Sequence, residues 1–114
     1  MRWTWLMLAA AGLAAVPAFA APRNARCVIA STETPTWRGA CRFLAEGGGS
    51  FSISAPRGDF GDGVGVISVT IIRPGVAEVR GLTEDGINSR WGEARRSPRD
   101  RACWIGEDFS ICVY

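Results

Sequence analysis

The stretch Val64–Leu82, VGVISVTIIRPGVAEVRGL, contains a long apolar run followed by the pair Pro74-Gly75. Its first half, Val64–Ile72, is rich in β-branched residues, which favour strands over helices. A Pro-Gly pair is typical of a turn. The stretch therefore predicts a β-hairpin whose first strand, 64–72, lies centrally in a sheet and whose second strand is 76–82.

The alternation of side chains along this hairpin also suggests its register. A two-residue turn would pair Thr70 with Val79 and mix polar and apolar side chains on one face. Pairs whose numbers sum to 150, such as Ile71 with Val79, match like with like. We therefore expect a three- or five-residue loop with Gly75 in a left-handed conformation.

The composition beyond residue 20 favours a β fold throughout. That part of the chain holds seven Val and eight Ile but only two Leu and no Met, and Leu and Met favour helices. Segment 87–96 is either a strand or partly irregular, and further strands are expected at 27–30, 36–44, 50–54, 102–105 and 109–113. Their spacing predicts an all-β domain, a small antiparallel barrel or sandwich of seven to eight short strands.

The first twenty residues, MRWTWLMLAAAGLAAVPAFA, have the order of a secretory signal peptide. Arg2 precedes an apolar stretch, Pro17 ends it, and the last three residues form an A-x-A cleavage site. The apolar stretch is short for a membrane anchor. We therefore expect 1–20 to be a cleaved signal peptide, 21–26 a short leader and 27–114 a single β domain. The protein is expected to be periplasmic or secreted, with no stable membrane anchor.

The charge of the chain is nearly balanced and its basic residues are all of one type. All 13 basic residues are Arg, there are 11 acidic residues, and there is no His or Lys. Without Arg2 the formal charge is +1. A chain so close to neutral has no general attraction for nucleic acid, and none is expected as a partner.

Four cysteines in a small exported domain predict two disulfides, and hairpin geometry indicates which. Cysteines directly opposite each other have a turn midway between them. The midpoint of Cys103 and Cys112 falls in the polar turn Glu107-Asp108, and that of Cys27 and Cys41 falls at Thr34. We expect the two disulfides Cys27–Cys41 and Cys103–Cys112, each across its own hairpin. Because the spacing lacks the close Cys pairs of zinc modules, no metal site is expected.

The residue types needed for the commonest catalytic arrangements are missing. Without His or Lys, and with all cysteines oxidised, the Ser-His-Asp, Cys-His and Ser-Lys arrangements are excluded. The carboxylate pairs Asp59/Asp62, Glu84/Asp85 and Glu107/Asp108 lie in predicted turns, where such residues occur for local reasons. We therefore expect no enzyme and no cofactor.

One segment concentrates positive charge and contains an aromatic residue. Interleaved Arg and aromatic side chains can bind acidic glycans or an acidic protein surface. The alternative is a solvated strand and turn with local ion pairs. The candidate binding surface, for an unknown protein or an envelope glycan, consists of Ser89, Arg90, Trp91, Arg95, Arg96, Arg99 and Arg101.

Two local patterns resemble a known group of proteins. The segment 39–43, GACRF, leads to 49–53, GSFSI, and the segment 102–105, ACWI, leads to Ile111-Cys112. These patterns resemble short, uncharacterised exported proteins that are widespread in Gram-negative bacteria. The resemblance implies export and the C-terminal disulfide, and it implies no activity.

The expected architecture is also similar to that of the periplasmic C-type lysozyme inhibitors, which are signal-bearing, disulfide-bonded eight-stranded barrels of this size. Their Ser-Gly-x-x-Tyr-like inhibitory segment has a distorted counterpart in 88–91, NSRW, and the near-neutral charge departs from the acidic balance that would suit a cationic lysozyme. Our leading hypothesis is a non-enzymatic exported binding or envelope-accessory module. The alternative is a lysozyme inhibitor-like protein.

Overall fold

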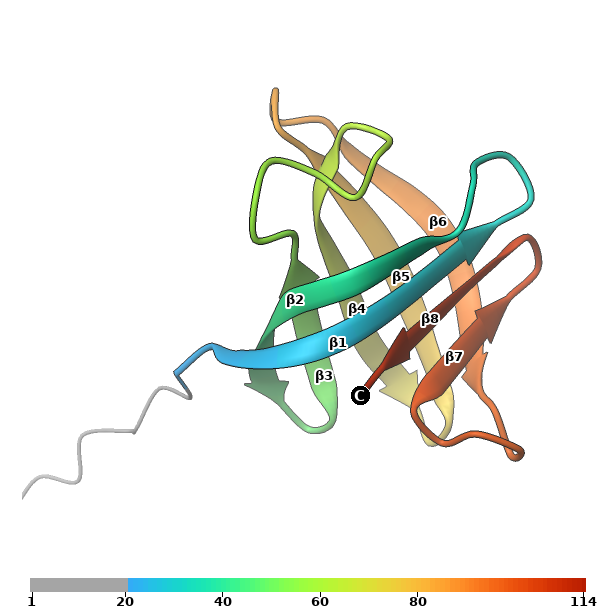
Figure 1. The fold of residues 1–114 in the computed structure, drawn as a ribbon. Helices are drawn as coiled ribbons and strands as arrows, with labels where there is room; N and C mark the ends of the chain where they lie inside the picture. The colour runs from blue at the N-terminus through green and yellow to red at the C-terminus, as the bar shows by residue number, and fades with distance from the viewer. Residues whose placement is uncertain (1–20) are drawn as a thin grey trace, which may run out of the picture.

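Eight antiparallel strands close into a barrel in which each strand pairs with its neighbours along the chain (Figure 1). The structure is a computed structural model that describes residues 21–114. The predicted signal peptide, 1–20, lies outside the described residues. The strands are β1 (Arg23–Ser31), β2 (Trp37–Gly47), β3 (Ser50–Ser54), β4 (Val64–Arg73), β5 (Val76–Thr83), β6 (Asn88–Arg96), β7 (Cys103–Gly106) and β8 (Phe109–Val113). The all-β prediction is confirmed, and of the two architectures left open it is the barrel that forms.

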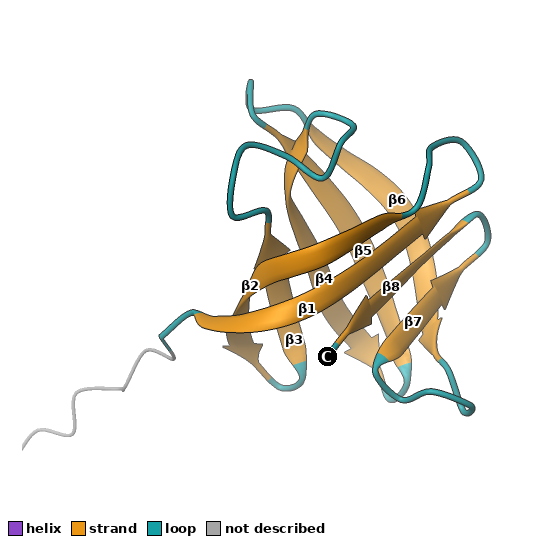
Figure 2. Cartoon of the chain, in the orientation of Figure 1, coloured by secondary structure: helices purple, strands orange, loops and turns teal. Residues whose placement is uncertain are grey.

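The connections lie alternately at the two ends of the barrel (Figure 2). We call the end that holds the loops 32–36, 55–63, 84–87 and 107–108 the upper end. The end that holds 48–49, 74–75 and 97–102 is the lower end. None of the residues 21–114 belongs to a helix able to cross a membrane.

The core fills the inside of the barrel, as expected where eight strands leave an interior only wide enough for side chains. Burial alternates along the strands, with every second residue of β3 buried. The largest fully buried side chains are Ile53, Ile67, Ile111, Val69, Val79, Cys27 and Cys41. The Val and Ile residues that dominate the composition are therefore the ones that fill the interior.

Both predicted disulfides are present. Cys103 lies opposite Cys112 across the two-residue turn 107–108, as predicted. Cys27 and Cys41 are bonded, but Cys27 lies opposite Gly39, so the two cysteines are diagonal neighbours with Cα atoms 5.8 Å apart. The direct pairing expected for this hairpin is therefore wrong by two residues. A shift of two leaves every side chain on its own face, so the alternation of residues cannot detect it.

The β4–β5 hairpin corrects a second expectation. Its loop has only two residues, Pro74-Gly75, because Arg73 pairs with Val76. A bulge follows at once, and Ile71 lies opposite Ala77 rather than Val79. The bulge adds one residue to β4, so that apolar residues again lie opposite apolar residues and polar opposite polar, as the sequence predicts. Gly75 has a φ of 72°, as predicted.

The leader expected at 21–26 is mostly part of the barrel, because β1 begins at Arg23. Arg26 and Tyr114 are joined by two backbone hydrogen bonds of 2.9 and 2.8 Å, and Ala25 is buried in the core. Pairing with β2 and with the end of β8 satisfies the backbone of these residues. The strand at 87–96 is regular except for one bulge.

Candidate functional site

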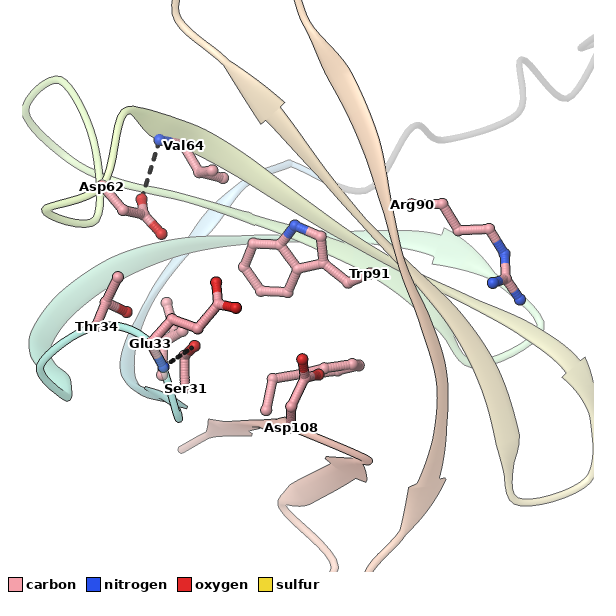
Figure 3. Close-up of a pocket in the computed structure, with 10 residues that line it drawn as sticks. Ser31, Glu33, Thr34, Asp62, Val64, Arg90, Trp91 and Asp108 are labelled. Atoms are coloured by element: carbon pink, nitrogen blue, oxygen red, sulfur yellow. Dashed lines mark hydrogen bonds between the residues drawn. The ribbon is translucent and has the colours of Figure 1, made fainter.

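The upper end of the barrel holds an open hollow of about 400 Å³, which we call the mouth pocket (Figure 3). Its floor is formed by Ile29, Val64, Trp91 and Phe109, and its rim by Ser31, Glu33, Thr34, Asp62, Arg90 and Asp108. Small-molecule sites have volumes of about 300–1,000 Å³, with apolar walls and a few polar groups. The mouth pocket therefore has the size and the lining of a ligand site.

Trp91 reaches the floor through a bulge in β6. Val79 of β5 lies opposite Gly92, while the next residue, Arg80, lies opposite Arg90, so Trp91 is the extra residue. Gly92 has a φ of 123°, a conformation that favours glycine. Bulges redirect side chains, and here the indole turns into the mouth of the barrel while Arg90 points away from it (Figure 3).

Two glycines leave room for the aromatic floor. A Cβ at Gly81 would lie 2.8 Å from Nε1 of Trp91, and a Cβ at Gly106 would overlap the ring of Phe109. The two rings meet edge to face, with centroids 5.6 Å apart and an angle of 69° between planes. The floor therefore depends on the absence of side chains at two strand positions.

Three carboxylates stand on the rim, each from a different connection: Glu33 from 32–36, Asp62 from 55–63 and Asp108 from 107–108. In Figure 3 the three side chains lie in an arc on one side of the Trp91 indole. Within residues 21–114 none of the three belongs to an ion pair. In the same residues, no three His, Cys, Asp or Glu side chains are grouped closely enough to hold a metal ion.

The loop that carries Asp62 is held in place by its own contacts. Phe60 is buried against Trp37 with ring centroids 4.9 Å apart, and its amide donates to the Val64 carbonyl at 2.9 Å. Asp62 Oδ1 accepts a hydrogen bond from the Val64 amide at 3.0 Å. One oxygen of the carboxylate is thus engaged by the loop, which fixes the position of the group on the rim.

The four upper connections together gather negative charge. They contain seven of the eleven acidic residues and a single arginine, Arg57, which is a formal charge of −6. The rest of the described chain carries four acidic residues and eleven arginines, a formal charge of +7. The chain is almost neutral overall, but its carboxylates are concentrated in the upper connections, whereas most of its arginines lie in the strands and at the lower end.

The structure divides the candidate binding surface between two places. Arg90 and Trp91 line the mouth pocket, although Arg90 Nε donates to Glu78 Oε1 at 3.0 Å. Ser89 lies exposed on β6 beside them. The remaining arginines, Arg95, Arg96, Arg99 and Arg101, lie toward the lower end or in its loop 97–102.

The lower end has its own hollow of about 400 Å³, lined in part by Arg96, Arg101 and Trp104. Here one of the two lining arginines, Arg96, already has partners inside the protein. Arg96 Nε donates to the Arg101 carbonyl at 2.8 Å, and the Arg96 guanidinium lies 5.7 Å from the centre of the Trp104 ring. Trp104 itself is buried. These contacts hold the loop 97–102 against the barrel, which leaves the mouth pocket as the better ligand site.

One further polar contact lies at the lower end. The Tyr114 hydroxyl donates to Asp100 Oδ2 at 2.5 Å, and the Ala102 amide donates to Asp100 Oδ1 at 3.0 Å. The Tyr114 bond, followed by the Ala102 bond, lowers the pKa of Asp100 from its ordinary 3.8. The bond to Asp100 raises the pKa of Tyr114 above its ordinary 10.0. The contact ties the C-terminal residue to the loop 97–102.

Of the ten residues that line the mouth pocket, the sequence pointed only to Arg90 and Trp91 as binding residues, and among the eight that it missed are Glu33, Asp62, Asp108 and Phe109. A signal for the carboxylates was present, because the first, third, fifth and seventh connections between strands hold seven acidic residues and the other three connections hold only Asp100. In an up-and-down barrel these four connections share one end. The strand order is needed to show that these acidic residues lie close to one another at the same end.

Comparisons of this chain with protein-family models, with curated proteins and with solved structures give no match.

Proposed function

We propose that this protein is a non-enzymatic, exported binding module of the bacterial envelope that holds its ligand in the mouth pocket. The observation that carries the proposal is the mouth pocket itself, an open hollow with an aromatic floor and a polar rim. The two disulfides, Cys27–Cys41 and Cys103–Cys112, are consistent with an oxidising, exported environment. The predicted signal peptide at 1–20 supports periplasmic location or secretion.

The residue types at the mouth pocket support binding rather than catalysis. The whole chain has no His and no Lys, and all four cysteines are in disulfides. The rim offers hydroxyls and carboxylates, and the floor offers apolar and aromatic surface. Such a lining suits recognition of a ligand by shape, stacking and charge.

The test is capture of envelope material by immobilised protein comprising residues 21–114. Periplasmic extract and soluble peptidoglycan fragments are each applied to the wild type, to Trp91→Leu and to Arg95→Ala/Arg99→Ala. We expect a ligand that the wild type and the arginine variant retain and that Trp91→Leu loses, as identified by mass spectrometry. Turnover of an envelope substrate that depends on one carboxylate would overturn the proposal, and so would a ligand lost only by the arginine variant.

A lysozyme inhibitor-like function is the second candidate, and the negative charge of the upper connections favours it. The near-neutral total argues against a cationic partner, but the upper connections alone carry a formal charge of −6. This candidate predicts stoichiometric inhibition of a C-type lysozyme, weakened by Ser89→Ala or Arg90→Ala. Absence of inhibition at micromolar excess would remove it.

A further inference from the structure

The mouth pocket combines an apolar floor with negative charge, and this combination restricts the chemistry of its ligand. The floor presents Trp91 and Phe109 beside Ile29 and Val64. A cation within about 6 Å of an indole face is attracted by the ring, and the attraction grows when the site is shielded from water. The floor therefore suits a ligand with an apolar body and a positively charged group.

The rim supplies the complementary charge and nothing in the described chain neutralises it. Glu33, Asp62 and Asp108 form no ion pair within residues 21–114. The arginine of the rim, Arg90, shares Glu78 with Arg80, and its side chain points away from the hollow (Figure 3). The rim thus presents three carboxylates, and the side chain of its one arginine is directed away from them.

The surroundings strengthen this preference. Four further carboxylates, Asp59, Glu84, Asp85 and Glu107, belong to the same end of the barrel. Like charge gathered around a hollow with low-dielectric walls focuses the field and raises the local concentration of oppositely charged ligands. An anion would be repelled by the rim, and a neutral molecule would leave the carboxylates without a partner.

We infer that the mouth pocket binds a small organic cation, an ammonium or guanidinium group carried on an aromatic or branched aliphatic body. The inference rests on the proposed function and names its class of ligand. The charged group lies among Glu33, Asp62 and Asp108, and the apolar body lies on Trp91. The volume of about 400 Å³ matches one small molecule, whereas a specific protein partner buries about 800 Å² on each side.

Three probes of similar size separate charge from apolar contact: 2-phenylethylamine, 2-phenylethanol and 3-phenylpropionate. Each is titrated into isotopically labelled protein, and the indole N–H resonance of Trp91 is followed by NMR. We expect the amine to shift this resonance saturably, the alcohol to bind at least tenfold more weakly and the carboxylate to produce no shift. We also expect the amine's affinity to fall at least threefold between 20 and 500 mM NaCl.

Variants locate the charge that matters. Asp62→Asn/Asp108→Asn should weaken binding of the amine at least tenfold, and the side-chain carbonyl introduced at position 62 can still accept the bond from the Val64 amide. The matched control is Glu84→Gln/Glu107→Gln, which removes the same charge from the same end but outside the pocket lining. We expect at most a threefold loss in the control. An equal loss in both variants would overturn the placement of the cation on the rim.

The remaining outcomes separate this inference from the proposed function. If the alcohol or the carboxylate shifts Trp91 as strongly as the amine, the pocket binds ligands but the inference of a cation is wrong. If a lysine-rich peptide binds at Trp91 at least tenfold more tightly than every small amine, the ligand is a polypeptide and the inference is wrong. If no probe shifts the Trp91 indole resonance, and Trp91→Leu captures the same envelope material as the wild type, both proposals fail.

Discussion

At the scale of single residues, the mouth pocket depends on where side chains are absent. Gly81 lies directly under Trp91, and Gly106 lies under Phe109. Both glycines are in strands, where glycine is unfavourable because it packs nothing and loses the most backbone freedom. Their presence there is explained by the aromatic rings that take the space of a side chain. The floor of the pocket is therefore built at a small cost in strand stability.

Gly81→Ala tests this relation. The new Cβ would lie 2.8 Å from Trp91 Nε1, and overpacking of this kind costs about 2 kcal/mol. We expect a lower midpoint of urea unfolding and a shifted Trp91 indole resonance. The control is the double variant Gly81→Ala/Trp91→Leu, in which much of the clash is relieved. If Gly81→Ala lowers the stability of the Trp91→Leu protein as much as that of the wild type, the indole does not occupy this space.

The contact between Asp100 and Tyr114 gives a prediction about pH. The pKa of Asp100 is lowered in the folded state, so its contribution to stability is present above pH 3.8 and is lost as the pH falls through the folded value. The pKa of Tyr114 is raised, so its contribution is present below pH 10.0 and is lost as the pH rises through the folded value. Tyr114→Phe should remove the alkaline loss and reduce the acid loss.

The measurement is the denaturant midpoint as a function of pH for the wild type, Tyr114→Phe and Asp100→Asn. Ala102 still donates to Asp100 in Tyr114→Phe, so part of the acid loss should remain there. In Asp100→Asn it should be absent. Identical pH profiles for the wild type and Tyr114→Phe would show that the hydroxyl does not interact with Asp100 in solution.

At the scale of the strands and hairpins, the two disulfides lie in different environments. Cys27–Cys41 belongs to the buried core between β1 and β2, because both side chains point into the barrel. Cys103–Cys112 joins β7 and β8, with the Cys103 Sγ 3.7 Å from the Tyr114 hydroxyl. The first is a part of the packing, and the second holds the last hairpin and the C-terminal residue together.

Removal of each disulfide separately should show this difference. The chain-entropy model gives about 3 kcal/mol for the 14-residue separation of Cys27 and Cys41 and about 2.5 kcal/mol for the separation of 9 between Cys103 and Cys112. Replacement of the buried pair by Ala also leaves unfilled space in the core. We expect Cys27→Ala/Cys41→Ala to lose more stability in guanidinium unfolding than Cys103→Ala/Cys112→Ala. The reverse order would contradict the placement of the first disulfide in the core.

The individual strands could be predicted from the sequence to within a few residues. The strand predicted at 50–54 is confirmed, because Phe51 and Ile53 alternate with serines, and Pro74-Gly75 forms the predicted turn. The registers were harder, because alternation cannot distinguish shifts of two residues or foresee a bulge. The expected pairings of Ile71 with Val79 and of Cys27 with Cys41 are wrong for this reason. In the structure Ile71 lies opposite Ala77 and Cys27 lies opposite Gly39.

At the scale of the whole molecule, the negative charge of the upper connections is expected to favour the binding of cations and to lower the stability of the fold. Carboxylates collected at one end repel one another, and release of such repulsion at a surface is worth about 0.5 kcal/mol. Glu33→Gln/Asp108→Asn should therefore raise the free energy of unfolding by about this amount while weakening the binding of organic cations. Chemical denaturation at low ionic strength measures the first effect. A loss of stability in this variant would mean that the carboxylates stabilise the upper loops instead.

The sequence by itself determined the class of fold, the approximate strands and the two cysteine pairs. These depend on interactions between residues close together in the chain: side-chain alternation, turn residues and closure of short hairpins. Tertiary structure decided that the sheet closes, because β1, the first strand of the described residues, pairs with β8, the last. Closure also brings Glu33, Asp62 and Asp108 to one mouth above Trp91 and Phe109. Local sequence patterns cannot predict that these residues lie together, because their proximity depends on the order of the strands around the barrel.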